Sequence, residues 1–194
     1  MTTHFLREDD IADLRAYEKE RPGFQQRVMG MRRRRRVTLG PVLTAAFESR
    51  DTVRYQIQEM LRAERRLDHG AVESELDAYN PLLPGNGELS VTLFVEVTEP
   101  GEVRTWLTSL AGLERHLALV LADGREFRAR AETGHARTLT RSDVTPAVHY
   151  LRIGVPVDAG SIVGATLVVD HPAYTARTPL RDETVREILL DLAA

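Results

Sequence analysis

The sequence contains no cysteine. This absence excludes disulfide bonds, thiolate nucleophiles, zinc fingers and iron–sulfur clusters ligated by this chain alone. Long apolar runs are also absent, since no window approaches the roughly 18 apolar residues of a membrane span. The first ten residues, MTTHFLREDD, are acidic and have no apolar run, unlike a secretory signal. We therefore expect a soluble cytoplasmic protein with no membrane partner.

Motifs that identify several enzyme classes are missing as well. The short GNG at 85–87 precedes a strand-like segment rather than a helix, so it predicts a turn and not a phosphate loop. No GxSxG is present to form the nucleophile elbow of a serine hydrolase. No HExxH or HxH spacing fixes a metal.

Lysine is nearly absent: of 26 basic residues only Lys19 is a lysine, which leaves 26 − 1 = 25 arginines. Five of them are consecutive, at 32–36, although the net charge is −3. A helix would spread five arginines around its circumference, and a strand would divide them between two faces. No stacking aromatics are interleaved with them. The run therefore favours solvated or intramolecular ion-pairing side chains, with nucleic-acid binding as a lesser alternative.

The first part of the sequence predicts mainly helices. One helix begins in the acidic segment near residue 8 and ends at Pro22–Gly23, and a second, short helix follows in FQQRVMGMRRRRR. Gly40–Pro41 then separates two strand-like runs of a hairpin. Further helices are expected at about 52–67, closed by His69–Gly70, and at AVESELDAY.

The second part predicts strands, because LSVTLFVEV alternates apolar and other residues and DG lies at the turn of a following hairpin. A short helix is expected in PGEVRTWLTSLAG, strands in AVHYLRIGVPV and GATLVVDH, and a helix at the C-terminus. The fold class is therefore α+β: a mostly antiparallel sheet or partial barrel packed with N-terminal helices and a C-terminal helix. We expect one domain over 1–194, helix-rich in 1–80, strand-rich in 88–180, with the last helix at about 181–192.

Glu64 is the first candidate site residue. Val53, Ile57, Leu61 and their apolar neighbours form one stripe of the helix at 52–67, and Glu64 falls inside that stripe at 100° per residue. A carboxylate that faces a core is paired, protonated or bound to a cation, because an unpaired buried charge is too costly.

Two histidines also follow apolar rows. His149 alternates with Leu151 and Ile153, and His171 follows Leu167 and Val169. Two imidazoles and one carboxylate suit a divalent metal with open positions, as in non-heme iron oxygenases and some zinc hydrolases. We therefore predict Glu64, His149 and His171 as ligands of iron, manganese or zinc.

Glu59 and Gln56 lie on the flank of the same helical stripe. Glu59 is predicted to be a fourth ligand or a catalytic general base, and Gln56 to orient a ligand from the second layer around the cofactor. The alternative is structural: the histidines are hydrogen-bonded core residues, and Glu64 pairs with an arginine.

Several segments together resemble a known bacterial family. RRVTLGPVLTAAFESRDTVRYQIQEMLRAE, ELDAYNPLLP, AVHYLRI and VDHPAY are similar to the family catalogued as domain of unknown function 3501, over nearly the whole chain. That family has no established activity. The resemblance implies a link to redox or oxidative-stress metabolism, and its segments contain all five candidate residues.

Two classes of function remain open from the sequence. The first is a metal-dependent hydrolase or oxygenase that acts on a small-molecule substrate. The second is a non-catalytic interaction module, an accessory to a redox protein partner, in which the inward Glu and His residues are structural.

Overall fold

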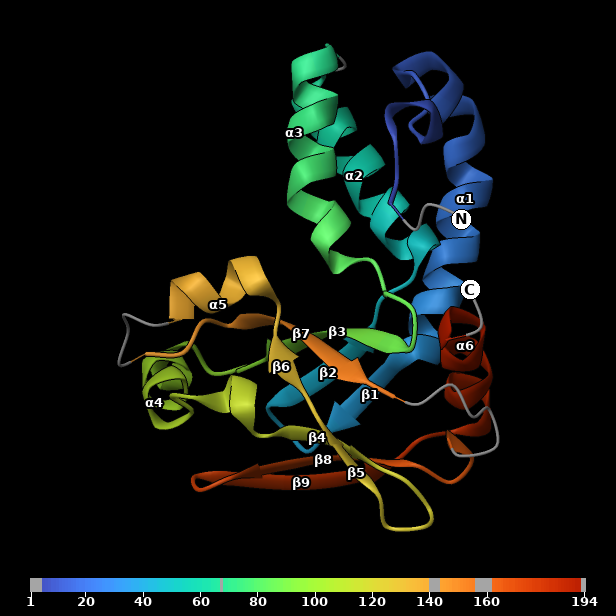
Figure 1. Cartoon of the computed structure of the whole chain (residues 1–194). Helices are drawn as coiled ribbons and strands as arrows, with labels where there is room; N and C mark the ends of the chain where they lie inside the picture. The colour runs from blue at the N-terminus through green and yellow to red at the C-terminus, as the bar shows by residue number, and fades with distance from the viewer. Residues whose placement is uncertain (1–4, 67, 140–143, 156–161, 193–194) are drawn as a thin grey trace.

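The computed structural model describes residues 5–66, 68–139, 144–155 and 162–192 (Figure 1). Its α-helices are α1 (Leu14–Arg35), α2 (Arg50–Glu64), α3 (His69–Tyr79), α4 (Val103–Ser109), α5 (Thr133–Leu139) and α6 (Asp182–Leu192). Short 3₁₀ helices are η1 (Glu8–Asp10), η2 (Asn80–Leu82), η3 (Pro100–Glu102) and η4 (Leu113–Arg115). The strands are β1 (Arg36–Leu39), β2 (Leu43–Phe47), β3 (Glu88–Val95), β4 (Leu117–Val120), β5 (Glu126–Arg128), β6 (Arg130–Ala131), β7 (Val148–Gly154), β8 (Thr166–His171) and β9 (Tyr174–Pro179).

The strands form two antiparallel sheets, which confirms the predicted α+β class. One sheet has the order β1-β2-β3-β7-β6 and the other the order β5-β4-β8-β9. The sheets lie one above the other, and α6 packs at one end of the pair (Figure 1). Within the described ranges the strands do not close into a barrel.

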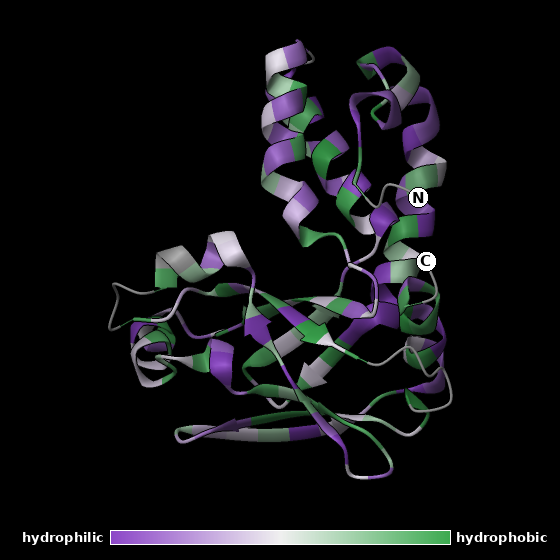
Figure 2. Cartoon of the chain, in the orientation of Figure 1, coloured by the Kyte–Doolittle hydropathy of each residue, from purple (hydrophilic) through white to green (hydrophobic). Residues whose placement is uncertain are grey.

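The main hydrophobic core fills the space between the two sheets. Leu93 and Leu151 contribute from the five-stranded sheet, Leu119 and Leu167 from the four-stranded sheet, and Ile188 from α6. Figure 2 shows hydrophobic residues along the strands of both sheets. Full burial of each such side chain contributes about 1.5–3 kcal/mol.

Helices α1, α2 and α3 rise from one side of the sheets and form the helical lobe (Figure 1). Its interior consists of two small apolar clusters, one with Phe24 and Tyr55 and one with Leu61 and Val72. Ion pairs between α1 and α2 add to this packing: Arg21–Glu59, Arg54–Glu20 and Arg62–Glu18.

The prediction that Pro22 and Gly23 end the first helix is wrong, because α1 runs through both residues. A proline inside a helix removes one hydrogen bond and costs about 3 kcal/mol or more. Tyr17 and Phe24, on either side of the proline, are fully buried against the rest of the lobe. Tertiary packing therefore offsets the local cost, and the two predicted helices are one.

The end of α2 also differs from the prediction. The helix stops at Glu64, because Arg65 adopts a left-handed conformation (φ 54°) as its C-cap. The predicted last residue, Leu67, lies outside the described residues. His69 and Gly70 begin α3, whose N-cap is Asp68, and do not close the preceding helix.

The hairpin of β1 and β2 is confirmed, with Gly40 in its turn at φ 71°. A side chain on Gly40 would collide with the hydroxyl of Tyr174, which donates a hydrogen bond to the Leu39 carbonyl. This contact joins β1 of one sheet to β9 of the other. Strand β9, which pairs with β8, was not predicted from the sequence.

Candidate ligand cavity

Glu64 does not face a core. Its side chain is exposed, at the last position of α2, so the prediction that it lies inward is wrong. The buried stripe of α2 contains Val53, Ile57 and Leu61, and beyond Leu61 the helix ends near the tip of the helical lobe (Figure 1). Glu64, three residues beyond Leu61, is exposed, so the buried stripe ends at Leu61 although the helical periodicity includes Glu64.

His149 is fully buried on β7, on the inward face that the sequence predicted. Its Nε2 lies 2.9 Å from the Thr145 hydroxyl, and its ring meets that of His135 edge to face at 5.5 Å between centroids. Burial, with a smaller contribution from the nearby His135, lowers the pKa of His149 to about 4. The imidazole is therefore neutral at physiological pH.

His171 is also buried, and both of its ring nitrogens are occupied. The Ala173 amide donates to Nδ1 at 3.1 Å, so Nε2 carries the proton and donates to the Ala111 carbonyl at 3.1 Å. His171 therefore has the geometry of a hydrogen-bonded core residue, the structural alternative to a metal ligand. His171 lies on the four-stranded sheet and His149 on the five-stranded sheet.

The three predicted ligands are not gathered at one point. Among the described residues, no group of three or more His, Cys, Asp or Glu is placed to hold a metal ion. The assignment of iron, manganese or zinc to Glu64, His149 and His171 stays a prediction.

Glu59 belongs to the lobe's ion pairs. Its carboxylate accepts two hydrogen bonds from the Arg21 guanidinium and one from the Tyr17 hydroxyl, each at 2.8 Å. The bonds from Arg21, with that from Tyr17, lower the pKa of Glu59 to about 2. A carboxylate with this pKa and these partners is a weak proton acceptor, so the geometry favours a structural role over a general base.

Gln56 has a different position from the other four candidates, because it lines a cavity. The cavity has a volume of about 660 Å³ and lies between the helical lobe and the outer face of the five-stranded sheet. This size falls within the range of small-molecule sites.

Strand alternation places the floor of this cavity. Residues that point away from the main core on β2, β3 and β7 face the lobe instead, and they are Ala46, Thr92, Phe94, Val148 and Tyr150. The walls come from the end of α1, the start of α2, Tyr79 at the end of α3 and Leu82 at the end of η2. The floor is therefore largely apolar and aromatic, and the wall from α1 is basic.

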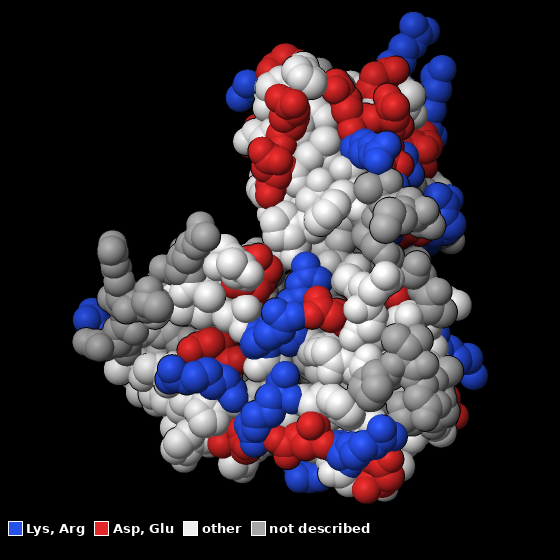
Figure 3. All heavy atoms as spheres, viewed as in Figure 1, with Lys and Arg blue, Asp and Glu red and all other residues white. Residues whose placement is uncertain are grey.

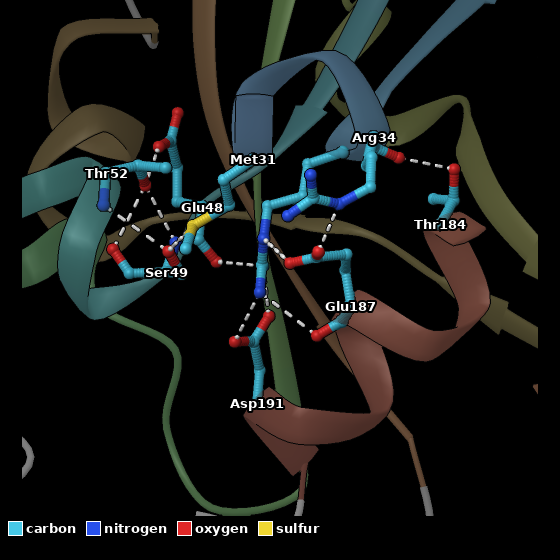
Figure 4. Close-up of polar contacts among 9 residues, drawn as sticks. Met31, Arg34, Glu48, Ser49, Thr52, Thr184, Glu187 and Asp191 are labelled. Carbon is cyan, nitrogen blue, oxygen red and sulfur yellow. Dashed lines mark hydrogen bonds and ion pairs between the residues drawn. The ribbon is translucent and has the colours of Figure 1, made fainter. Parts of the chain in front are cut away.

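The consecutive arginines divide into two groups at this wall. Arg34, Arg35 and Arg36 make ion pairs inside the molecule. Figure 4 shows how α6 supplies Glu187 and Asp191 to this region. The Arg35 guanidinium is 3% exposed and donates to both carboxylates and to the main-chain carbonyl of Glu48. These three arginines are intramolecular ion-pair donors.

Arg32 and Arg33 form the second group and face the cavity. Arg32 stacks over the Tyr55 ring at 5.3 Å and reaches Gln56 Oε1 only at 3.4 Å. The side chain of Arg33 makes no hydrogen bond or ion pair with any residue that the structure describes. Two guanidinium groups at one cavity therefore have no carboxylate partner within the described ranges.

The sequence contained a signal for this site that the face assignment did not use. Val148 and Tyr150 alternate with His149 on β7, and Phe94 alternates with Leu93 on β3. Apolar and aromatic residues on both faces of a strand indicate that both faces are covered. Glu48 and Arg33 had no comparable signal, because their partners come from the fold alone.

Comparison with known proteins gives a structure and a family without a named activity. No curated protein matches the chain. A crystal structure of a novel protein of unknown function from Burkholderia pseudomallei is similar, with 33% sequence identity and a TM-score of 0.86 over 96% of this chain and 98% of that one. Residues 5–192 match the family described as "Protein of unknown function (DUF3501)", which confirms the resemblance noted in the sequence. The chain belongs to this family.

Proposed function

We propose that the protein binds a small organic anion in the cavity between the helical lobe and the five-stranded sheet. The observation that carries this proposal is the pair of guanidinium groups, Arg32 and Arg33, that face the cavity without a carboxylate partner among the described residues. An unpaired guanidinium favours a carboxylate or phosphate, which it binds with two parallel hydrogen bonds.

The charges around the cavity favour an anion over a cation. Four arginines and one glutamate line it. Arg35 and Arg36 are neutralised by Asp191, Glu187 and Glu96, which leaves Arg32 and Arg33 against Glu48. The net charge of these three side chains is +1.

The aromatic part of the lining favours an apolar body on the ligand. Tyr79, Phe94 and Tyr150 contact the cavity from two sides, and their ring faces and edges suit an aromatic or aliphatic group. This function falls in the class of binding modules.

Calorimetry with a series of aryl carboxylates, from phenylacetate to 4-phenylbutanoate, tests the proposal on the full chain. We expect saturable binding that Arg33→Gln weakens by about tenfold, the loss of one charge-assisted contact. Arg15→Gln is the matched control, because Arg15 is an exposed arginine of α1 outside the cavity lining. No binding by any member of the series, or equal weakening by both variants, would contradict the proposal.

A further inference from the structure

The cavity also contains an unpaired negative charge. The Glu48 carboxylate lines the cavity, and no basic nitrogen of the described residues lies within 4.0 Å of it. Arg35 donates a hydrogen bond to the main-chain carbonyl of Glu48 and not to its carboxylate. Its other hydrogen bonds go to Asp191 and Glu187. Within the described residues, Glu48 is therefore a charged cavity group without a counter-charge, as Arg32 and Arg33 are.

Two hydroxyl groups fix the orientation of this carboxylate. Thr92 on β3 donates to Oε1 and Thr52 on α2 donates to Oε2, each at 2.7 Å. Each carboxylate oxygen has a further lone pair to offer. The hydroxyls hold the carboxylate in place but do not neutralise it, so a cationic donor would complete its environment.

Glu48 and Arg33 carry opposite charges but do not contact each other. Glu48 lies beside the floor strand β3, whereas Arg33 projects from the end of α1. Both line one cavity of about 660 Å³, and they make no ion pair with one another. A ligand that carries both charges would satisfy both groups at once, whereas a simple anion would satisfy only the arginines.

We propose that the ligand is an amphipathic zwitterion, an amino acid with an aromatic or apolar side chain, whose ammonium contacts Glu48 and whose carboxylate contacts Arg33. This inference rests on the proposed function, because it names the ligand class of the same cavity. Gln56 of α2 lines the same cavity and offers its side-chain amide to either charged group of the ligand. The aromatic or apolar side chain of the ligand packs on Tyr150 and Phe94.

Matched pairs of ligands test the inference on the unmodified protein. Phenylacetate, 3-phenylpropanoate and 4-phenylbutanoate are each compared with the α-amino acid of the same skeleton: phenylglycine, phenylalanine and homophenylalanine. We expect the best amino acid to bind at least about tenfold more tightly than its carboxylate, because a charge-assisted hydrogen bond contributes about 1.5–3 kcal/mol. Phenethylamine, which lacks the carboxylate, should bind more weakly than phenylalanine.

The outcomes separate the two proposals. Equal affinities within every matched pair would overturn the zwitterion and leave the anion cavity standing. No binding by either series would remove both. A preference for the amino acids that Glu48→Gln abolishes, while it leaves the carboxylates unchanged, is the expected result. Glu64→Gln is the matched control, since it removes the same charge from an exposed position. The comparison of ligands on the wild-type chain decides the inference even if Glu48→Gln fails to fold.

Discussion

The two-sheet body and the helical lobe are stabilised by different interactions. The body contains one continuous apolar core that extends from Leu39 on β1 to Leu192 on α6. The lobe divides its apolar residues between two smaller clusters and links its helices by arginine–carboxylate pairs. On the face shown in Figure 3, acidic side chains gather toward the tip of the lobe. The body should therefore respond to lost volume, and the lobe to pH and salt.

The largest effect is expected where the two regions meet. Arg35→Met should lower the free energy of unfolding by about 3–5 kcal/mol, because it leaves the largely buried Asp191 without its cation and Glu187 with Arg34 alone. Chemical denaturation measures the loss. Arg34→Gln is the control: Arg34 also pairs with Glu187 but is 43% exposed, so it should cost no more than about 1 kcal/mol. Equal losses in both variants would show that the buried ion pairs of Arg35 contribute no more to stability than the exposed ion pair of Arg34.

A cavity in the body should have the next largest effect. Leu151→Ala removes a side chain that is 1% exposed between the sheets, and we expect a loss of about 2–5 kcal/mol. The loss should change little between pH 7 and pH 4, because the residue carries no charge. A strongly pH-dependent loss would mean that the body, like the lobe, depends on its ion pairs.

Glu59 tests the pH sensitivity of the lobe. Its pKa is lowered from the ordinary value of 4.5 to about 2 by the Arg21 and Tyr17 hydrogen bonds, so its contribution is complete above about pH 4.5 and is lost as the pH falls toward 2. Glu59→Gln should cost on the order of 2 kcal/mol at pH 7, after solvent screening, and very little near pH 2. Denaturation curves across this pH range measure the difference. A constant cost at every pH would contradict the ion-pair explanation.

The smallest effect is expected at Glu64. Because its side chain is exposed at the end of α2, Glu64→Gln should change the free energy of unfolding by no more than about 0.5 kcal/mol. Thermal melts with and without a chelator would complete the measurement. A large loss that only a metal-supplied sample shows would restore Glu64 as a ligand.

The fold could be predicted because periodicity and turn residues are local. Leu89 to Val95 alternates, Gly40 bends the first hairpin, and both elements formed as expected. Pro22 misled the prediction for the opposite reason: the packing of Tyr17 and Phe24 on α2 depends on residues far along the chain.

The candidate site was less predictable for a related reason. Periodicity placed His149 and His171 inward, and both are buried. It could not show that His149 Nε2 meets Thr145 and that the His171 nitrogens meet main-chain groups, rather than one another. The cavity depends on how the lobe stands over the outer face of β3 and β7, and no single segment encodes that placement. Gln56 reached the cavity because it lies on the face of α2 turned toward that sheet.

Because α1 is one continuous helix, a rotation at one of its ends displaces the other end. Its 22 residues span about 33 Å, with Arg33 near one end and the tip of the lobe near the other. A tilt of about 5° at the cavity end would carry the far end through roughly 3 Å. Fluorescent labels at the start of α1 and on β9 would measure any such tilt without touching the cavity. Because the chain has no cysteine of its own, a pair of introduced thiols would be the only attachment points.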